Sequence, residues 1–116
     1  MEIFPIGIVK DRSDGTKEIR VYDEFSDGLK NVESREHLWV LFWMNRLSEK
    51  DRKILLVHPQ GNRAREKQGV FALHSPMRPN PIGMTRVRLI ERLDNILIVE
   101  GLDAFDETPV IDIKSA

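Results

Sequence analysis

The sequence contains no cysteine, which excludes disulfides, thiol nucleophiles and zinc sites built from cysteine. It has no run of about 18 apolar residues, the length that a membrane-spanning helix needs. The first five residues lack the basic and apolar regions of a signal peptide. Together these absences predict a cytoplasmic protein with no membrane partner.

Common nucleotide-binding and hydrolase motifs are missing as well. The seven glycines form neither a Gly-x-Gly-x-x-Gly fingerprint nor a P-loop, so a Rossmann-type nucleotide site is not expected. No Gly-x-Ser-x-Gly nucleophile elbow occurs. The histidines His37, His58 and His74 lack metal-ligand spacing, and we predict no metal site.

The chain does have many short apolar segments separated by turns. Its 116 residues, 41% of them hydrophobic, suffice for one domain over residues 1–116 with a modest core. Strands are expected at residues 3–9, 17–22, 37–44, 54–58, 69–74, 84–93, 96–102 and 110–113. No long helix is expected, although Ser48-Glu-Lys-Asp51 could cap a short helix or turn. Six to eight short strands predict an all-β barrel or sandwich.

The charges are unevenly distributed although the net charge is only −1. Basic residues dominate between His58 and Arg92, and acidic residues dominate from Leu93 onward. This pattern is consistent with a phosphate-facing surface beside an acidic pocket wall. Taken alone, the charges favour the plainer interpretation, a solvated face whose charges balance across the fold.

The segment from Gly69 to Gly83 is the most informative, because Pro76, Pro79 and Pro81 stiffen its second half. A stiff, extended loop would hold Arg78 and Asn80 in set directions, which favours a ligand-binding role.

A second candidate is the turn that contains Asp103 and Asp106. Its carboxylates could hold ribose hydroxyls or an ammonium group, or could simply form an Asx-turn. The aromatic residues Trp39, Phe42 and Trp43 could stack on a base or belong to the core.

Three segments resemble the TsaA-like, TrmO-type family of tRNA methyltransferases. Gly69-Val-Phe-Ala-Leu-His-Ser-Pro-Met-Arg-Pro-Asn-Pro-Ile-Gly83 is similar to the family's signature, and its Arg-Pro-Asn-Pro-Ile-Gly core is highly specific. Residues 37–43 and 106–114 resemble two further family segments, so the likeness covers almost the whole chain in order. His74 stands where the family has an arginine.

The resemblance implies a small β-barrel that forms a homodimer and binds S-adenosyl-L-methionine without a Rossmann fold. It further implies methylation of N6 of the threonylcarbamoyl-modified adenosine 37 of tRNA. The cofactor-binding positions that it implies are Asn45, Arg46, His74, Met84, Asp103, Ala104, Phe105 and Asp106.

We add two hypotheses about the tRNA substrate. Arg78 and Asn80 would orient the modified adenine, because a guanidinium pairs well with the carboxylate of the threonylcarbamoyl group. Arg63, Arg65 and Lys67 would contact phosphates. No residue is assigned as a general base.

Three alternatives stay open from the sequence. The same cofactor-binding barrel could act on a small molecule or a protein, or the chain could be a non-catalytic RNA-binding barrel. It could also be a structural or regulatory dimer, with the segment from Trp39 to Trp43 at its interface.

Overall fold

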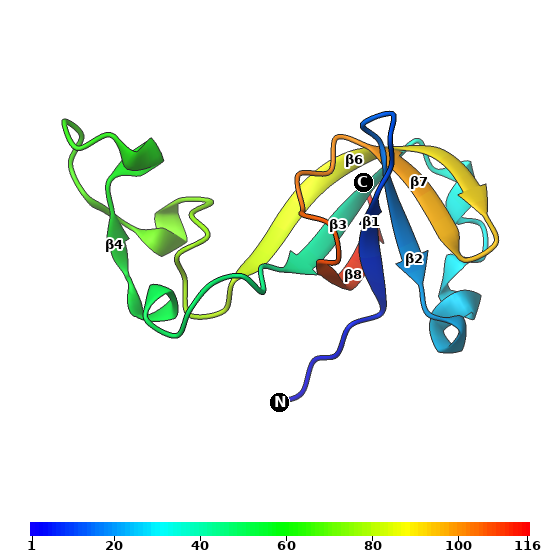
Figure 1. Ribbon diagram of the computed structural model, residues 1–116, viewed down its shortest axis with the longest axis horizontal. Coiled ribbons are helices and arrows are strands. Elements are labelled where there is room, and N and C mark those ends of the chain that lie inside the picture. The colour runs from blue at the N-terminus through cyan, green and yellow to red at the C-terminus, as the bar shows by residue number, and fades with distance from the viewer.

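The computed structural model describes all residues from Met1 to Ala116. Six antiparallel strands close a barrel in the order β1-β2-β7-β6-β3-β8 (Figure 1). Their bounds are Gly7–Asp11 for β1, Lys17–Val21 for β2, His37–Trp43 for β3, Ile82–Leu93 for β6, Ile96–Glu100 for β7 and Pro109–Ser115 for β8. The all-β barrel predicted from the sequence is therefore confirmed.

Alternating side chains on the strands build the core inside the barrel. In β3, Leu38, Val40 and Phe42 are buried, whereas Trp39 and Trp43 are half-exposed on the other face. The core interpretation thus holds for Phe42 but not for the two tryptophans. β7 contributes three consecutive buried residues, Leu97–Val99. Each fully buried Val, Leu or Ile side chain contributes about 1.5–3 kcal/mol to folding.

Residues 44–81 form a lobe that projects from the barrel between the end of β3 and the start of β6 (Figure 1). The molecule is accordingly elongated, at 46 × 31 × 25 Å. The lobe contains a two-stranded sheet of β4 (Leu56–Val57) and β5 (Gln68–Gly69), together with three single-turn 3-10 helices. These helices are η3 (Asp51–Lys53), η4 (Pro59–Gly61) and η5 (Val70–Ala72).

Two predicted strands are therefore wrong. The segment 54–58 shrinks to the two residues of β4, and only the first residue of the segment 69–74 lies in a strand. Both segments have apolar, β-favouring side chains, but they lie outside the barrel, where no long neighbouring strand can pair with them. Ser48 and Asp51 close the turn that leads into η3, because the backbone N–H of each donates to the side chain of the other at 3.0 and 3.1 Å. Hydrogen bonding by Ser48 lowers the pKa of Asp51, its backbone N–H contributing most and its side chain next.

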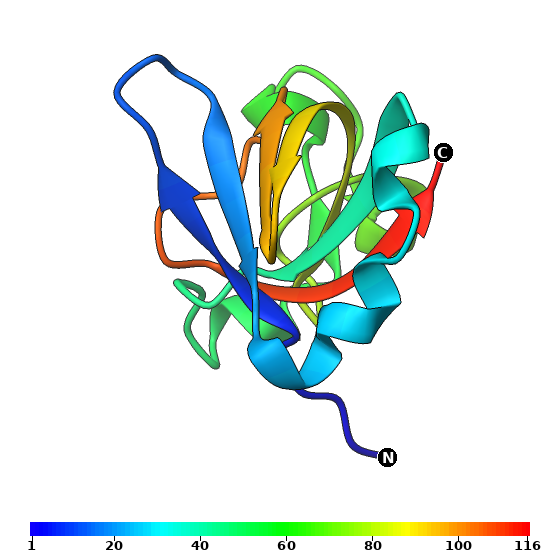
Figure 2. The same cartoon turned by 90° about the vertical axis from the view of Figure 1, so that its right-hand side faces the viewer.

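On the opposite side of the barrel, two further 3-10 helices connect β2 to β3. They are η1 (Asp23–Leu29) and η2 (Val32–Ser34). Figure 2 shows both helices beside the C-terminal end of the chain, with the lobe behind the barrel. No helix in the structure combines the length and the apolar character needed to cross a membrane.

Gly7 provides a test of the barrel geometry. It pairs with Val21, and a Cβ atom at Gly7 would lie 2.5 Å from the backbone oxygen of Arg20. We expect Gly7→Ala to lower the free energy of unfolding by about 1–3 kcal/mol, the usual cost of overpacking. Gly28→Ala is the control, because nothing lies within 4 Å of its added Cβ. Urea denaturation with equal midpoints for the two variants would contradict this packing.

Candidate functional site

Two adjoining hollows open where the lobe leaves the barrel. The turn hollow has a volume of about 250 Å³ and is lined by Asn45, Arg46, Leu47, Pro76, Ala104, Phe105 and Thr108, besides shared residues. The lobe hollow has a volume of about 500 Å³ and is lined by Phe71, Leu73, His74, Arg78, Ile82, Gly83, Met84 and Thr85, besides shared residues. Phe42, Met44 and Asp103 line both. Most of the predicted cofactor-binding residues thus come together from three separate segments.

The acidic turn, residues 101–108, connects β7 to β8 and forms one wall. Gly101 begins it with φ of +92°, a conformation that favours glycine. Leu102 and Ala104 are buried in the barrel, whereas Asp103 and Phe105, which follow them one by one, are exposed. This alternation directs the polar and aromatic side chains outward to the hollows.

The two carboxylates of this turn have different surroundings. The hydroxyl of Thr85 donates to Oδ1 of Asp103 at 2.5 Å, which holds that carboxylate against β6. Oδ1 of Asp106 instead accepts from the backbone N–H of Asp11 at 2.7 Å. Asp106 lines neither hollow. Asp103 is therefore the carboxylate placed to meet a ligand.

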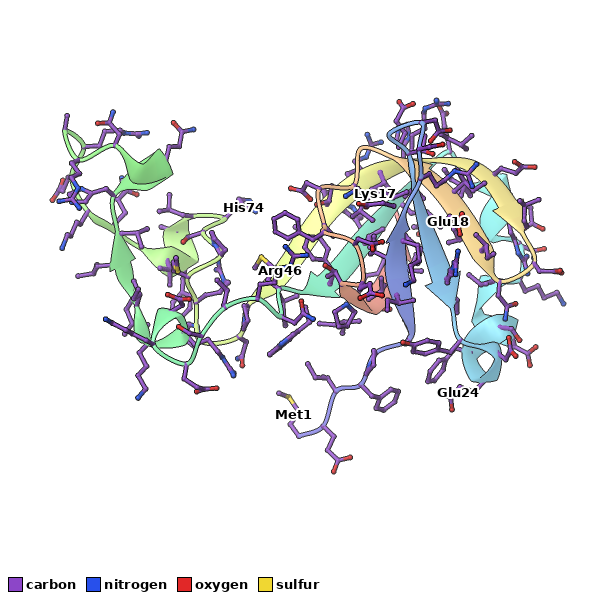
Figure 3. All side chains as sticks on the ribbon, in the orientation of Figure 1. Met1, Lys17, Glu18, Glu24, Arg46 and His74 are labelled. Carbon is purple, nitrogen blue, oxygen red and sulfur yellow. The ribbon has the colours of Figure 1, made fainter.

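An arginine and an aromatic ring face each other in the turn hollow. The guanidinium carbon of Arg46 lies 4.3 Å from the ring centroid of Phe105, a cation–π contact. Phe105 is nevertheless 60% exposed. Figure 3 shows Arg46 at the point where the chain leaves the barrel for the lobe. Such a pair offers flat surfaces against which a heterocyclic base can stack.

Two arginines hold the proline-rich loop, residues 75–81, in place. Nη1 of Arg78 donates to the backbone oxygens of Ser75 and Leu73 at 2.6 and 3.3 Å. Nε of Arg52 donates to the backbone oxygen of Pro79 at 2.8 Å. Arg78 lines the lobe hollow but Asn80 lines neither hollow. The loop is thus ordered by a contact from η3 of the lobe and by Arg78 itself. Arg78 uses only Nη1 in these bonds, so its other nitrogens can donate to a ligand.

His74 lies on the lobe, across from the barrel (Figure 3). Its exposed imidazole lines the lobe hollow with Phe71 and Met84. Sequence reasoning did not identify Phe71 or Thr85. Phe71 lies inside the Gly69–Gly83 segment and Thr85 directly follows Met84, and these positions were the only available signal.

The basic residues Arg63, Arg65 and Lys67 lie elsewhere, in the exposed loop between η4 and β5. None of them lines either of the two hollows or takes part in an ion pair. The backbone oxygen of Arg65 is held by Nδ1 of His58 at 2.8 Å. The structure thus separates these three side chains from the other predicted site residues.

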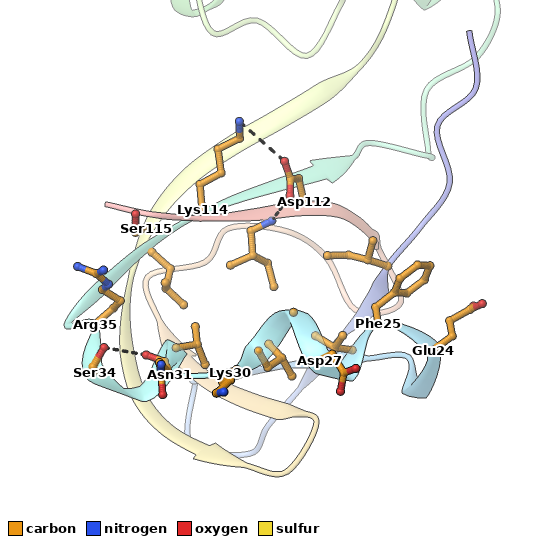
Figure 4. Close-up of a pocket in the computed structure, with 17 residues that line it drawn as sticks. Glu24, Phe25, Asp27, Lys30, Asn31, Ser34, Arg35, Asp112, Lys114 and Ser115 are labelled. Carbon is orange, nitrogen blue, oxygen red and sulfur yellow. Dashed lines mark hydrogen bonds and ion pairs between the residues drawn. The ribbon is translucent and has the colours of Figure 1, made fainter.

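The largest hollow of the molecule, about 750 Å³, lies between η1, η2 and β8 (Figure 4). Its floor includes the buried residues Val21, Leu29 and Leu38, and its rim carries charges of both signs. It contains no residue of the predicted site. We therefore place the candidate site at the two smaller hollows.

Fold and site together define a small β-barrel domain with a candidate ligand site at the base of a projecting lobe. The sequence model of the tRNA-methyltransferase O N-terminal domain family matches residues 8–115, and the chain belongs to this family. It is 41% identical over 111 residues to "Probable S-adenosyl-L-methionine-binding protein MJ1583" of Methanocaldococcus jannaschii, covering 95% of this chain. It is 38% identical over 113 residues to the tRNA (adenine(37)-N6)-methyltransferase of Escherichia coli, covering 93% of this chain.

A solved structure described as "Crystal structure of TrmO" superimposes with a TM-score of 0.75 at 27% identity, covering all of this chain. The relatives differ in length. The chain spans 87% of the Methanocaldococcus protein, 47% of the Escherichia coli enzyme and 57% of the TrmO chain. Of one relative from Archaeoglobus fulgidus it spans only 26%.

Proposed function

We propose that the chain binds S-adenosyl-L-methionine and methylates N6 of the threonylcarbamoyl-modified adenosine 37 of tRNA. The observation that carries this proposal is the convergence of Asn45–Arg46, His74–Met84 and Asp103–Phe105 on two adjoining hollows. The names of the Methanocaldococcus and Escherichia coli relatives support the cofactor and the reaction, respectively.

The turn hollow has the groups that a nucleoside cofactor needs. The backbone N–H groups of Ala104, Phe105 and Asp106 have no acceptor within the protein, so they are free to donate to ring nitrogens or to a carboxylate. Asp103 supplies an anionic acceptor suited to ribose hydroxyls or an ammonium group. The exposed ring of Phe105 supplies an apolar face for stacking.

When bound, the cofactor supplies an electrophilic methyl group on a sulfonium. The protein's task is then to align the nucleophile in line with that methyl group, which can account for much of a rate enhancement. The lobe hollow adjoins the turn hollow through Phe42, Met44 and Asp103. We place the modified adenine there, with the free guanidinium nitrogen of Arg78 on its carboxylate.

The tRNA body would lie along the lobe. Arg63, Arg65 and Lys67 are exposed and free of ion pairs, as phosphate-binding side chains should be. Asn80 lies outside both hollows, and its backbone oxygen accepts from Ile82 at 2.7 Å. Its role in orienting the adenine is therefore limited to shaping the loop.

We also propose a homodimer, because the lobe stands apart with apolar side chains uncovered. Leu55 and Leu56 are more than half exposed, and Phe71 is 77% exposed beside the lobe hollow. Exposed apolar patches of this kind mark interaction surfaces. A second copy packed on the lobe would cover them and add walls to an otherwise open site.

The histidine at position 74, where the family has an arginine, favours a second candidate function. An imidazole cannot reproduce the permanent, bidentate cation that the family's arginine supplies. The resemblance assigns His74 to the cofactor, but His74 lines the lobe hollow, where we place the modified adenine, so this difference also bears on the substrate. A cofactor-binding barrel that methylates another substrate is the alternative that this observation favours.

Two measurements test the proposal. Isothermal titration calorimetry with S-adenosyl-L-methionine should give saturable binding, and added tRNA carrying the modified adenosine should be methylated. Cofactor binding without tRNA methylation would favour another substrate. Salt-dependent tRNA binding that ignores the cofactor would favour the non-catalytic barrel. No binding of either ligand would leave the structural dimer.

A further inference from the structure

The hairpin of β1 and β2 is attached to the acidic turn by a chain of polar contacts that begins at Lys17. Nζ of Lys17, in β2, donates a hydrogen bond to the backbone oxygen of Ala104. The same ammonium lies 3.3 Å from Oδ1 of Asp11 at the end of β1. The backbone N–H of Asp11 in turn donates to Asp106 at 2.7 Å. Asp11 therefore contacts Lys17 through its carboxylate and Asp106 through its backbone N–H.

Lys17 is well enclosed at this point, because its side chain is only 22% exposed. Ala104, whose oxygen it holds, is buried in the barrel. A cation that is partly withdrawn from water and hydrogen-bonded to a carbonyl makes a stronger contact than a surface ion pair does.

The contact also fixes the peptide group that joins Ala104 to Phe105. The chain has no cis peptide bond, so the N–H of Phe105 points opposite to the oxygen of Ala104. With that oxygen held by Lys17, the N–H is directed away from the hairpin. This N–H lies between those of Ala104 and Asp106, and none of the three has an acceptor in the protein.

We propose that Lys17 is a positioning residue for cofactor binding, which orients the free N–H groups of the acidic turn for a ring nitrogen of the cofactor's adenine. Lys17 lines neither hollow and so acts only through Ala104. This inference rests on the proposed function. Through Lys17, the β1–β2 hairpin would take part in cofactor binding, although none of the three segments that resemble the family lies in it.

The test compares Lys17→Met with Lys10→Met in the full chain. Lys10 is a matched control, because its ammonium also links β1 to the end of the turn, at 2.9 Å from Oε1 of Glu107, but contacts no backbone oxygen. That hydrogen bond raises the pKa of Lys10, so the control side chain carries its charge at neutral pH. The readouts are calorimetric affinity for S-adenosyl-L-methionine and the kinetics of tRNA methylation.

We expect Lys17→Met to weaken cofactor affinity about five- to tenfold and to raise KM for the cofactor similarly. The value of kcat should stay within about twofold, because a uniformly weakened binding contact leaves kcat unchanged. Lys17→Arg should restore most of the affinity, and Lys10→Met should bind as the parent does. If Lys17→Met does not fold, Asp11→Asn replaces it, and we expect an affinity loss of about two- to threefold.

Unchanged affinity in Lys17→Met, or in Asp11→Asn when it is used, would overturn the positioning role while leaving the proposed function intact. Equal losses in Lys17→Met and Lys10→Met, or a fall in kcat alone, would overturn it too. A parent chain that does not bind S-adenosyl-L-methionine would instead refute the proposed function itself, and with it the role of Lys17.

Discussion

Replacing Asp103 by alanine is expected to weaken binding of S-adenosyl-L-methionine by about 10- to 100-fold, the worth of one hydrogen bond to a charged group. Asp103 is the carboxylate that lines both hollows, and Thr85 already holds it in place at 2.5 Å. A fixed carboxylate contributes more to binding than a mobile one, because less conformational freedom is lost when the ligand binds. Isothermal titration calorimetry measures the change.

Glu100→Ala is the control for this experiment. Glu100 ends β7, next to the acidic turn, and its only partner is the exposed Arg88 at 3.3 Å. Its removal alters the net charge as Asp103→Ala does but leaves the hollows intact, so affinity should match the parent. Thr85→Val should produce a smaller loss than Asp103→Ala, since it frees the carboxylate without removing it. Equal affinity of Asp103→Ala and the parent would contradict the assignment of the cofactor to this turn.

Replacing Arg78 by alanine is expected to lower kcat/KM for tRNA methylation by about 100-fold, with cofactor affinity nearly unchanged. The guanidinium holds the backbone oxygens of Leu73 and Ser75 through Nη1 and has its other nitrogens available in the lobe hollow. Its loss would remove a charged contact to the substrate and loosen the loop that presents it. Steady-state kinetics with modified tRNA measure the effect.

Arg86→Ala is the matched control, because Arg86 is an exposed arginine of β6 that lines neither hollow. Arg78→Lys adds a second comparison, since lysine keeps the charge but not the planar fork. We expect it to recover only part of the activity. If Arg78→Ala methylated tRNA at the rate of the parent, the substrate role of this loop would be refuted.

The barrel could be predicted from the sequence because its strands carry their own signals. In β3 and β7, apolar side chains occur in dense or alternating runs that are typical of buried strands. The lobe could not be predicted in the same way. Leu55, Leu56 and Phe71 have strand-like neighbours in sequence but are exposed in the structure. Local preference for β structure does not reveal whether a pairing strand exists.

The candidate site, too, could be predicted from the sequence only in part. Resemblance to a family selected residues such as Arg46 and Phe105, whose contact at 4.3 Å the structure then provides. It could not separate Asp103 from Asp106, because only the fold shows that Asp106 binds the backbone of Asp11. Nor could it find Lys17, whose contact with Ala104 joins residues far apart in the chain. Such long-range contacts depend on strand order and register, which no local pattern specifies.

The central claim is that this barrel transfers a methyl group from S-adenosyl-L-methionine to modified adenosine in tRNA. It is tested most directly by incubating the chain with tRNA that carries threonylcarbamoyladenosine and with cofactor bearing a deuterated methyl group. Nucleosides from the tRNA are then analysed by mass spectrometry. The account predicts the label on threonylcarbamoyladenosine with the parent chain and Arg86→Ala, and almost none with Arg78→Ala. Saturable cofactor binding with no label on any tRNA nucleoside would contradict it.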